Sequence, residues 1–278
     1  METIRIGISS CPNDTFAFEA IYNRRINLKG YKFEFIISDI EELNKQAFIG
    51  EIDVTKISFH AFAHLSEKYQ ILNSGNAIGY KNGPLLISKY KIYPDEIKNV
   101  HVAIPGKNTT ANLLLSVLYP EITNKTEYLF SDIEEVVLSK EVDAGLIIHE
   151  NRFTYEKKGL KKIVDLGEEW EKRTKKMIPL GGIIIKRTLP EKIKNDINRL
   201  IFESISFAHK NPKIVHSFVK QHAQEMNDEV MKKHIDLYVN KYTLELQDEG
   251  RKAIEYLLDL AKERNLVAEI HKPLFVLP

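Results

Sequence analysis

Short β-rich segments alternate with helical patterns through the first two-thirds of this 278-residue chain. Runs rich in β-branched and apolar residues predict strands at 4–9, 32–38, 54–57, 85–88, 100–104, 127–130, 144–148 and 182–186. Between these runs, apolar residues spaced three and four apart predict helices at 15–22, 40–49, 58–65, 110–118 and 133–138. Because such alternation is typical of βαβ units, we expect an α/β fold with largely parallel sheets.

The last third of the chain is helical in pattern. Apolar periodicity after Pro190 predicts helices at 193–210, 212–222, 228–238 and 247–264. The chain makes βα units, crosses at 89–98, makes more βα units and becomes helical near 189–190, which predicts a two-lobed clamshell with a helical C-terminal segment. We expect lobe 1 to comprise 1–90 and 188–278, lobe 2 to comprise 91–187, and a ligand to bind in the cleft between them, beyond the carboxyl ends of the strands.

Composition excludes several classes of protein. The chain has 40 Lys and Arg against 39 Asp and Glu, a formal net charge of +1, so a nucleic-acid partner is not expected. The single Cys cannot form an intramolecular disulfide, and Met1 leads into a strand pattern rather than an export signal. Apolar runs reach only about five residues, far below the roughly 20 that a membrane-spanning helix needs. We therefore expect a cytoplasmic protein with no membrane insertion, its oligomeric state left open.

The first candidate site is the turn Ser-Ser-Cys-Pro-Asn-Asp-Thr-Phe at 9–16, directly after the first predicted strand. Proline is favoured in the first turn of a helix, so small polar groups here, Asp14 among them, face the predicted cleft. The alternative is an ordinary helix cap. Cys11 is not favoured as a nucleophile, because the local sequence places no His or Asp beside it.

The second candidate site lies where the strand at 54–57 ends. Thr55, Lys56 and Ser58 would face the cleft, and Lys56 could meet an anionic ligand. The alternative is a surface lysine followed by a serine N-cap. His60 and His64 have a metal-ligand spacing, but alanine rather than the glutamate of a zinc-protease motif follows the first, so no metal site is expected.

The third candidate site is Ile-Pro-Gly-Lys-Asn-Thr-Thr-Ala at 104–111. A strand, a glycine-containing turn and a helix that opens at Thr109 and Thr110 would bind an anion, most simply a carboxylate, because first-turn N–H groups lack partners within the helix. The segment lacks the glycine frame of a Walker loop. The alternative is a plain βα turn.

The fourth candidate is His149, at the carboxyl end of the apolar strand pattern 144–148. An imidazole has an ordinary pKa near 6.5, so at this position it is a credible general base at neutral pH. The alternative is a hydrogen-bonded histidine at the edge of the core. We interpret the histidines of the helical segment as structural: His209, His216, His222 and His234.

Taken in order, the motifs carry a family resemblance. They are Ser-Cys-Pro-Asn-Asp-Thr-Phe, Asp-Val-Thr-Lys-Ile-Ser-Phe, Ile-Pro-Gly-Lys-Asn-Thr-Thr-Ala, Gly-Leu-Ile-Ile-His-Glu-Asn-Arg-Phe-Thr-Tyr and Pro-Leu-Gly-Gly. Together they resemble the 1,4-dihydroxy-6-naphthoate synthase family of the futalosine route to menaquinone, from about Ile4 to Lys272-Pro-Leu-Phe-Val. At 9–12 the chain has Ser-Ser-Cys-Pro where the family pattern reads Ser-Pro-Cys-Pro, a change that leaves the matched residues intact.

The resemblance implies a fold similar to type 2 periplasmic-binding proteins and a lyase reaction. Cyclic dehypoxanthinyl futalosine would be converted to 1,4-dihydroxy-6-naphthoate with release of dihydroxyacetone, without a metal or organic cofactor. The proton acceptor of the family matches His149. Its substrate-binding positions match Thr55, Lys56, Ile57, Thr110 and Ala111, to which the arguments from local structure add Thr109, Asp14 and Ser58.

Two other functions would use the same clamshell. One is a non-catalytic cytoplasmic solute-binding or sensory module, against which His149 argues because pure binding needs no base. The other is the sister enzyme chorismate dehydratase. The stretch His-Glu-Asn-Arg-Phe-Thr-Tyr argues against this second function.

Overall fold

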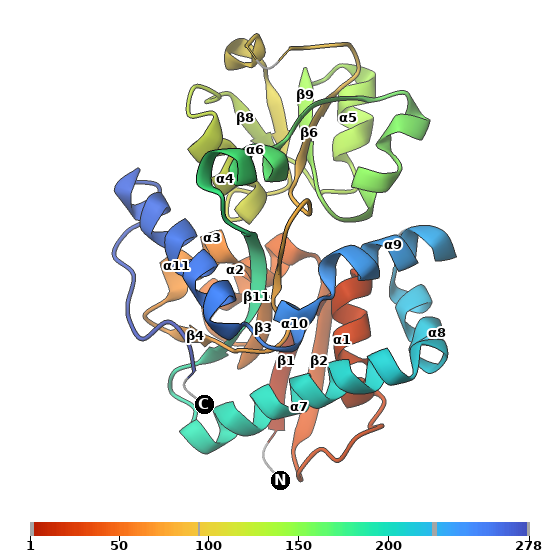
Figure 1. The fold of residues 1–278 in the computed structure, drawn as a ribbon, viewed down its shortest axis with the longest axis vertical. Coiled ribbons are helices and arrows are strands. Elements are labelled where there is room, and N and C mark those ends of the chain that lie inside the picture. The colour runs from red at the N-terminus through yellow and green to blue at the C-terminus, as the bar shows by residue number, and fades with distance from the viewer. Residues whose placement is uncertain (1–2, 94, 224–226, 277–278) are drawn as a thin grey trace.

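The computed structural model describes residues 3–93, 95–223 and 227–276, and it is an α/β fold with two sheets. Figure 1 shows the two sheets one above the other, each with its own helices. The first sheet has the order β2-β1-β3-β11-β4, with β5 paired to β11. Its strands are β1 (Thr3–Ser9), β2 (Lys32–Ser38), β3 (Val54–Ser58), β4 (Tyr69–Ile71), β5 (Ala77–Gly79) and β11 (Ile178–Lys186).

The second sheet has five strands in the order β10-β6-β9-β7-β8. They are β6 (Leu85–Ser88), β7 (Val102–Ile104), β8 (Lys125–Glu127), β9 (Ala144–Ile147) and β10 (Lys161–Asp165). In both sheets the βα units pair in parallel, as expected: β1 with β2 and β3, and β7 with β8 and β9. The strands that connect the sheets run antiparallel to their neighbours, so both sheets are mixed.

The two connections between the sheets lie at different points from those we expected. Strand β6 belongs to the second sheet, so the chain leaves the first sheet between Gly79 and Leu85, before the predicted crossing at 89–98. On the return, β11 pairs with β5, β3 and β4 in turn, so the whole of Ile178–Lys186 belongs to the first sheet. The division into two lobes, 1–90 with 188–278 against 91–187, therefore stays a prediction whose boundaries these connections would move.

Most helices have the predicted bounds within a few residues. Those of the two βα regions are α1 (Pro12–Tyr22), α2 (Ile40–Ile49), α3 (Phe59–Leu65), α4 (Thr110–Leu118), α5 (Ile133–Ser139) and α6 (Leu166–Thr174). The C-terminal segment contains α7 (Glu191–Lys210), α8 (Pro212–His222), α9 (Asp228–Tyr238), α10 (Lys241–Leu244) and α11 (Gln247–Glu263). Three 3-10 helices were not predicted: Ile97–Asn99, His149–Phe153 and Tyr155–Lys158.

The strand predicted at 127–130 lies at Lys125–Glu127 instead. It pairs with β7 from Val102↔Lys125 to Ile104↔Glu127, and β7 ends there, so the apolar residues that follow have no strand to continue against. We did not predict β4, β5, β10, α6 or α10. Because β4 and β5 have only three residues each, they are too short to show an alternating pattern.

The helical C-terminal segment packs on the first sheet, and it also reaches the second. Helix α7 lies across α1, and α9 packs against the 3-10 helix His149–Phe153 that follows β9 (Figure 1). The end of the chain returns to β4, where Ile71 donates its N–H to the Leu274 carbonyl and accepts from the Val276 N–H. Helix α9 thus brings side chains from the last third of the sequence to a strand end of the second sheet. Within the described ranges no helix combines the length and apolarity needed to cross a membrane.

Candidate functional site

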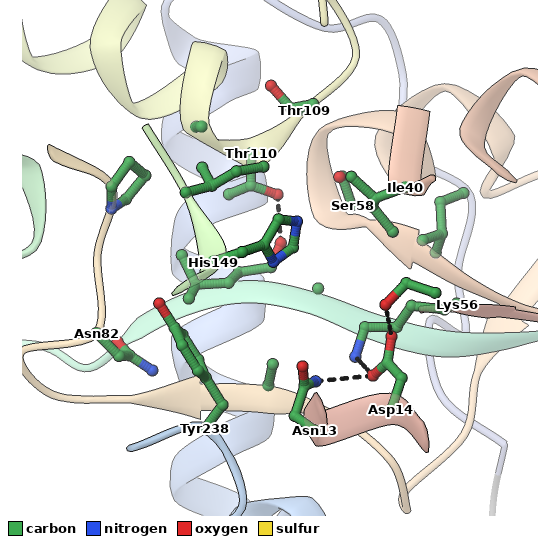
Figure 2. A pocket seen from close by; sticks show the side chains of 18 of the residues that line it. Asn13, Asp14, Ile40, Lys56, Ser58, Asn82, Thr109, Thr110, His149 and Tyr238 are labelled. Carbon is green, nitrogen blue, oxygen red and sulfur yellow. Dashed lines mark hydrogen bonds and ion pairs between the residues drawn. The ribbon is translucent and has the colours of Figure 1, made fainter. Parts of the chain in front are cut away.

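A cleft lies between the strand ends of the two sheets, and its empty space, counted to the open mouth, is about 640 Å³. Figure 2 shows the side chains that line it, drawn from elements of both sheets and from α9. The lining includes most of the residues that the sequence singled out: Asp14, Lys56, Ile57, Ser58, Thr109, Thr110, Ala111 and His149.

Polar side chains form one side of the cleft, which we call the paired wall: Ser9, Asn13, Asp14, Lys56 and Ser58. Lys56 Nζ lies 2.6 Å from Asp14 Oδ1, and both side chains are buried. Asp14 also accepts hydrogen bonds from Ser9 Oγ at 2.6 Å and from Asn13 Nδ2 at 2.8 Å. Lys56, which the sequence predicted to meet an anionic ligand, is thus already neutralised by the Asp14 carboxylate of α1.

Thr55 is the one predicted site residue that the structure does not bring into the lining of this cleft. Its hydroxyl donates to the Lys56 carbonyl at 3.0 Å, and the side chain is fully buried. It faces Gly7 on β1, where an added Cβ would lie 2.5 Å from Thr55 Oγ1. Thr55 lies near the start of β3, beside Gly7 of β1, and so away from the carboxyl end of the strand that faces the cleft.

The N-terminus of α4 opens onto the cleft as predicted. Thr109 is the N-cap: its hydroxyl accepts from the Asn112 N–H at 3.2 Å and donates to the Gly106 carbonyl at 2.8 Å. The Thr110 hydroxyl donates to the Leu180 carbonyl on β11, which ties the helix start to the first sheet. The first-turn amides of such a helix carry the positive end of its dipole toward the ligand space.

His149 begins the 3-10 helix after β9, and its backbone has φ +58°, in the left-handed region that non-glycine residues seldom adopt. The imidazole extends into the cleft (Figure 2). Its Nδ1 lies 3.2 Å from the Cys11 sulfur, whereas Nε2 is shielded from solvent and has no hydrogen-bond partner among the residues that the structure describes. Such an unusual backbone conformation is typical of residues held in place for function.

Three side chains lie close to the His149 imidazole. Together with it they form what we call the histidine cluster: Cys11, His149, Glu150 and His234. The His149 and His234 rings are stacked at 6.3 Å. His234 Nε2 lies 2.9 Å from Asn13 Oδ1, and its Nδ1 lies 3.9 Å from Glu150 Oε2. The cluster is therefore assembled from α1, the 3-10 helix after β9 and α9.

Burial sets the protonation states in the cluster. It lowers the pKa of His149 to about 4 and lowers the pKa of His234 well below its ordinary value, so both imidazoles are neutral at pH 7. Burial also raises the pKa of the Cys11 thiol, and the nearby Glu150 and Asp14 carboxylates add to the effect. An unprotonated imidazole therefore faces the cleft beside a protonated thiol.

Two lining residues from α9 were missed. We interpreted His234 as structural, yet His234 and Tyr238 both line the cleft, because α9 folds back over the strand end of the second sheet. Burial raises the pKa of Tyr238 to about 12, so its hydroxyl stays protonated. The four-residue spacing of these two places them on one helix face, which is the only local pattern that could have paired them.

The comparisons with known proteins agree with one another. Residues 4–263 match a family model described as menaquinone biosynthesis. A protein of Thermus thermophilus named 1,4-dihydroxy-6-naphthoate synthase is 39% identical over 99% of this chain and 100% of that protein. A second protein of that name, from Streptomyces coelicolor, is 35% identical over 96% of this chain and 95% of its own length.

The chain belongs to the 1,4-dihydroxy-6-naphthoate synthase family. It is thus an enzyme of menaquinone biosynthesis, as the resemblance implied. A crystallised protein from Archaeoglobus fulgidus has the same fold at 35% identity, with a TM-score of 0.90 over 95% of this chain and 98% of that one.

The fold of this synthase family is shared with transport proteins. The alkanesulfonate-binding protein of Xanthomonas axonopodis aligns with a TM-score of 0.74 at 13% identity, covering 97% of this chain and 95% of its own. A ligand-binding component of an ABC-type import system from Staphylococcus aureus aligns with a TM-score of 0.73 at 14% identity, covering 100% and 97%. These likenesses confirm the predicted similarity to periplasmic-binding proteins, and at such identities they concern the fold alone.

Proposed function

We propose that this chain is a carbon-carbon lyase that converts cyclic dehypoxanthinyl futalosine to 1,4-dihydroxy-6-naphthoate and dihydroxyacetone, with His149 as the general base. The observation that carries the proposal is the His149 Nε2 atom: it belongs to a neutral imidazole in the cleft and has no hydrogen-bond partner. A base needs such a free lone pair within reach of the substrate.

The contact with Cys11 supports Nε2 as the reacting nitrogen. If the ring proton sits on Nδ1, it is donated to the Cys11 sulfur 3.2 Å away, and the lone pair of Nε2 is left for the substrate. His149 then takes a proton from the carbon or hydroxyl beside the substrate carbonyl. The sugar-derived ring opens, the three-carbon piece leaves as dihydroxyacetone, and the bicycle becomes aromatic.

The two sides of the cleft would hold opposite ends of the substrate. Thr109, Thr110 and Ala111, at the N-terminus of α4, would bind the carboxylate through the hydroxyls and first-turn amides. The sugar hydroxyls would meet the paired wall, where Asp14 and Ser58 lie. Asp14 has three partners, and a carboxylate accepts about four hydrogen bonds, so one further substrate hydroxyl fits its capacity.

The remaining matched positions lie on β3. Lys56 and Ile57 line the cleft and would contact the substrate directly. Thr55 would act indirectly, since its hydroxyl bonds the Lys56 carbonyl. Closure of two lobes over the substrate would exclude water from the carbanion-like intermediate. We place the reaction in the cytoplasm, with this small molecule as the partner and no added metal or organic cofactor.

The test is to incubate the purified chain with cyclic dehypoxanthinyl futalosine and to follow both products by mass spectrometry. We expect dihydroxynaphthoate and dihydroxyacetone in equal amounts with the wild type. His149→Asn should bind the substrate with little change but give almost no product.

Three results would contradict the proposal. Tight binding without product from the wild type would favour a solute-binding or sensory clamshell. Loss of chorismate in a parallel assay would favour chorismate dehydratase. Turnover by His149→Asn close to that of the wild type would remove the assignment of the base while leaving the reaction standing.

A further inference from the structure

The side chains of the histidine cluster could bind a metal ion, a capacity that the proposed reaction does not use. Cys11, His149 and Glu150 each place one potential ligand atom so that all three lie within 4.8 Å of one another. The Cys11 sulfur and His149 Nδ1 are already 3.2 Å apart. Around a tetrahedral zinc ion with bonds of about 2.0 to 2.3 Å, ligand atoms lie about 3.3 to 3.8 Å apart, so small side-chain movements would bring these three onto one ion.

His234 adds an independent observation. Asn13 Nδ2 donates to Asp14, so Asn13 Oδ1 is the atom that faces His234 Nε2, and it can only accept. The ring proton of His234 is therefore on Nε2, and Nδ1 carries a lone pair. Within the described part of the chain this nitrogen has no hydrogen-bond partner; its side chain is 1% exposed, and it lies 3.9 Å from Glu150 Oε2.

A buried nitrogen lone pair without a hydrogen-bond partner costs free energy, and a positive charge placed beside it would relieve that cost. A divalent cation would supply that charge and would be neutralised in full, because a thiolate and a carboxylate contribute two negative charges and the imidazoles contribute none. Sulfur and imidazole nitrogen are ligands that Zn²⁺ and similar soft cations prefer over Mg²⁺ or Ca²⁺.

We propose that Cys11, His149, Glu150 and His234 form an inhibitory binding site for Zn²⁺ or a similarly soft divalent cation. The inhibition, though not the binding, rests on the proposed function. The ion displaces the thiol proton of Cys11 to solvent and bonds His149 through Nδ1. The ring proton of His149 must then sit on Nε2, which turns the catalytic base into a hydrogen-bond donor, so the enzyme stops while its ligand space stays open.

Binding is tested without any assay of turnover. Cd²⁺, a soft cation of the same charge, is titrated into the apo chain, and a thiolate-to-metal charge-transfer band is sought in the ultraviolet. Since Cys11 is the only cysteine, the band reports on this site alone. We expect one equivalent to saturate it, Cys11→Ser to abolish it, and Mg²⁺ to produce none. Zn²⁺ should compete with Cd²⁺ and remove the band.

Two further variants distinguish a built site from adventitious binding. Glu150→Gln and His234→Gln should each weaken Zn²⁺ binding at least tenfold in competition with a chromophoric chelator, because loss of even an outer-shell partner of a metal ion typically costs about 10- to 100-fold in affinity. His64→Asn is the matched control, because it breaks the other close pair of imidazoles, His60 and His64, whose rings are 5.5 Å apart. It should leave affinity unchanged. The proposed site would be overturned if the charge-transfer band were absent, or if Zn²⁺ affinity fell in His64→Asn but not in the Glu150 and His234 variants.

Turnover then tests the inhibition. In metal-free buffer the wild type and His64→Asn should be active, one equivalent of Zn²⁺ should abolish activity in both, and a chelator should restore it. A chain that turns over and binds Zn²⁺ without inhibition would overturn the switching step. If Cd²⁺ titration showed binding through Cys11 but the chain gave no turnover in metal-free buffer, the result would instead count against the proposed function.

Discussion

The two sides of the cleft solve the problem of buried polar groups in opposite ways. In the paired wall, Asp14 and Lys56 neutralise each other, and Ser9 and Asn13 donate two further hydrogen bonds to the carboxylate. In the histidine cluster, His149 Nε2 and His234 Nδ1 are buried without partners. Satisfied networks hold a structure in place, whereas unpaired atoms are costly and persist where they have a function. The comparison places rigidity on one side of the cleft and chemistry on the other.

The largest expected effect is on the reactive side. His149→Asn should lower kcat by a factor of about 10² to 10⁴, the usual contribution of a general base, with KM and the thermal unfolding temperature little changed. Asparagine is the better replacement because it tolerates the left-handed backbone at φ +58°, while His149→Ala should cost about 1 kcal/mol more of stability. Steady-state kinetics and thermal unfolding check both. If the variant instead showed a lower thermal unfolding temperature together with a raised KM, His149 would have a structural role rather than that of the base.

On the paired wall the effect should appear in stability. Lys56→Met leaves the Asp14 carboxylate buried without its cation and should lower the free energy of unfolding by about 3 kcal/mol in urea titrations. Lys186→Met is the matched control, because the Lys186–Asp53 pair at 2.9 Å is part exposed and should cost about 1 kcal/mol or less. Equal losses in the two variants would mean that burial of the Asp14 pair does not set its contribution.

The protonation states predict a pH dependence of stability. Burial holds the pKa of His60 and of His149 at about 4, below the ordinary 6.5, so the unfolded chain binds protons more readily than the folded one. The contribution of these two histidines to stability should be constant above pH 6.5, fall between 6.5 and about 4, and level off below. Each histidine contributes at most about 3 kcal/mol at 1.36 kcal/mol per pKa unit. His60→Asn should reduce the fall measured by urea titration at each pH. An unchanged slope would contradict the burial argument.

The smallest effect concerns the N-terminus of α4. Thr109→Ala removes the hydroxyl that accepts from the Asn112 N–H and should cost about 1 kcal/mol of stability. If the substrate carboxylate binds there, KM should rise several-fold with kcat nearly unchanged. Thr109→Ser keeps the capping oxygen and should restore both values. A loss of stability with KM unchanged would leave Thr109 as a cap alone.

Local patterns predicted the elements that position the site. Helices α2 and α4 have the predicted bounds, because apolar spacing and a capping residue act within a few residues of each other. The turns after β1, β3, β7 and β9 were expected to face one cleft, and they do. The crossing between sheets was misplaced, since the first sheet is completed by β4 and β5, three-residue strands that depend on β11 for pairing.

Contacts between distant segments could not be predicted in this way. Cys11 was set aside because no histidine is near it in the sequence, and the structure places His149, 138 positions away, 3.2 Å from its sulfur. His234 meets Asn13 across 221 positions. Thr55 was expected in the cleft as part of a strand end, but it lies near the start of β3, where its side chain packs beside Gly7 of β1.

The sequence alone determined the α/β class, most helix bounds, the family and the position of His149 at the end of a buried strand. These follow from short-range periodicity, capping and motif order, which are all written locally in the chain. Only the tertiary structure decided which groups are paired and which are left with free lone pairs. That outcome depends on how α1, β9 and α9 pack together, because burial and hydrogen-bond partners belong to the assembled core rather than to any one segment.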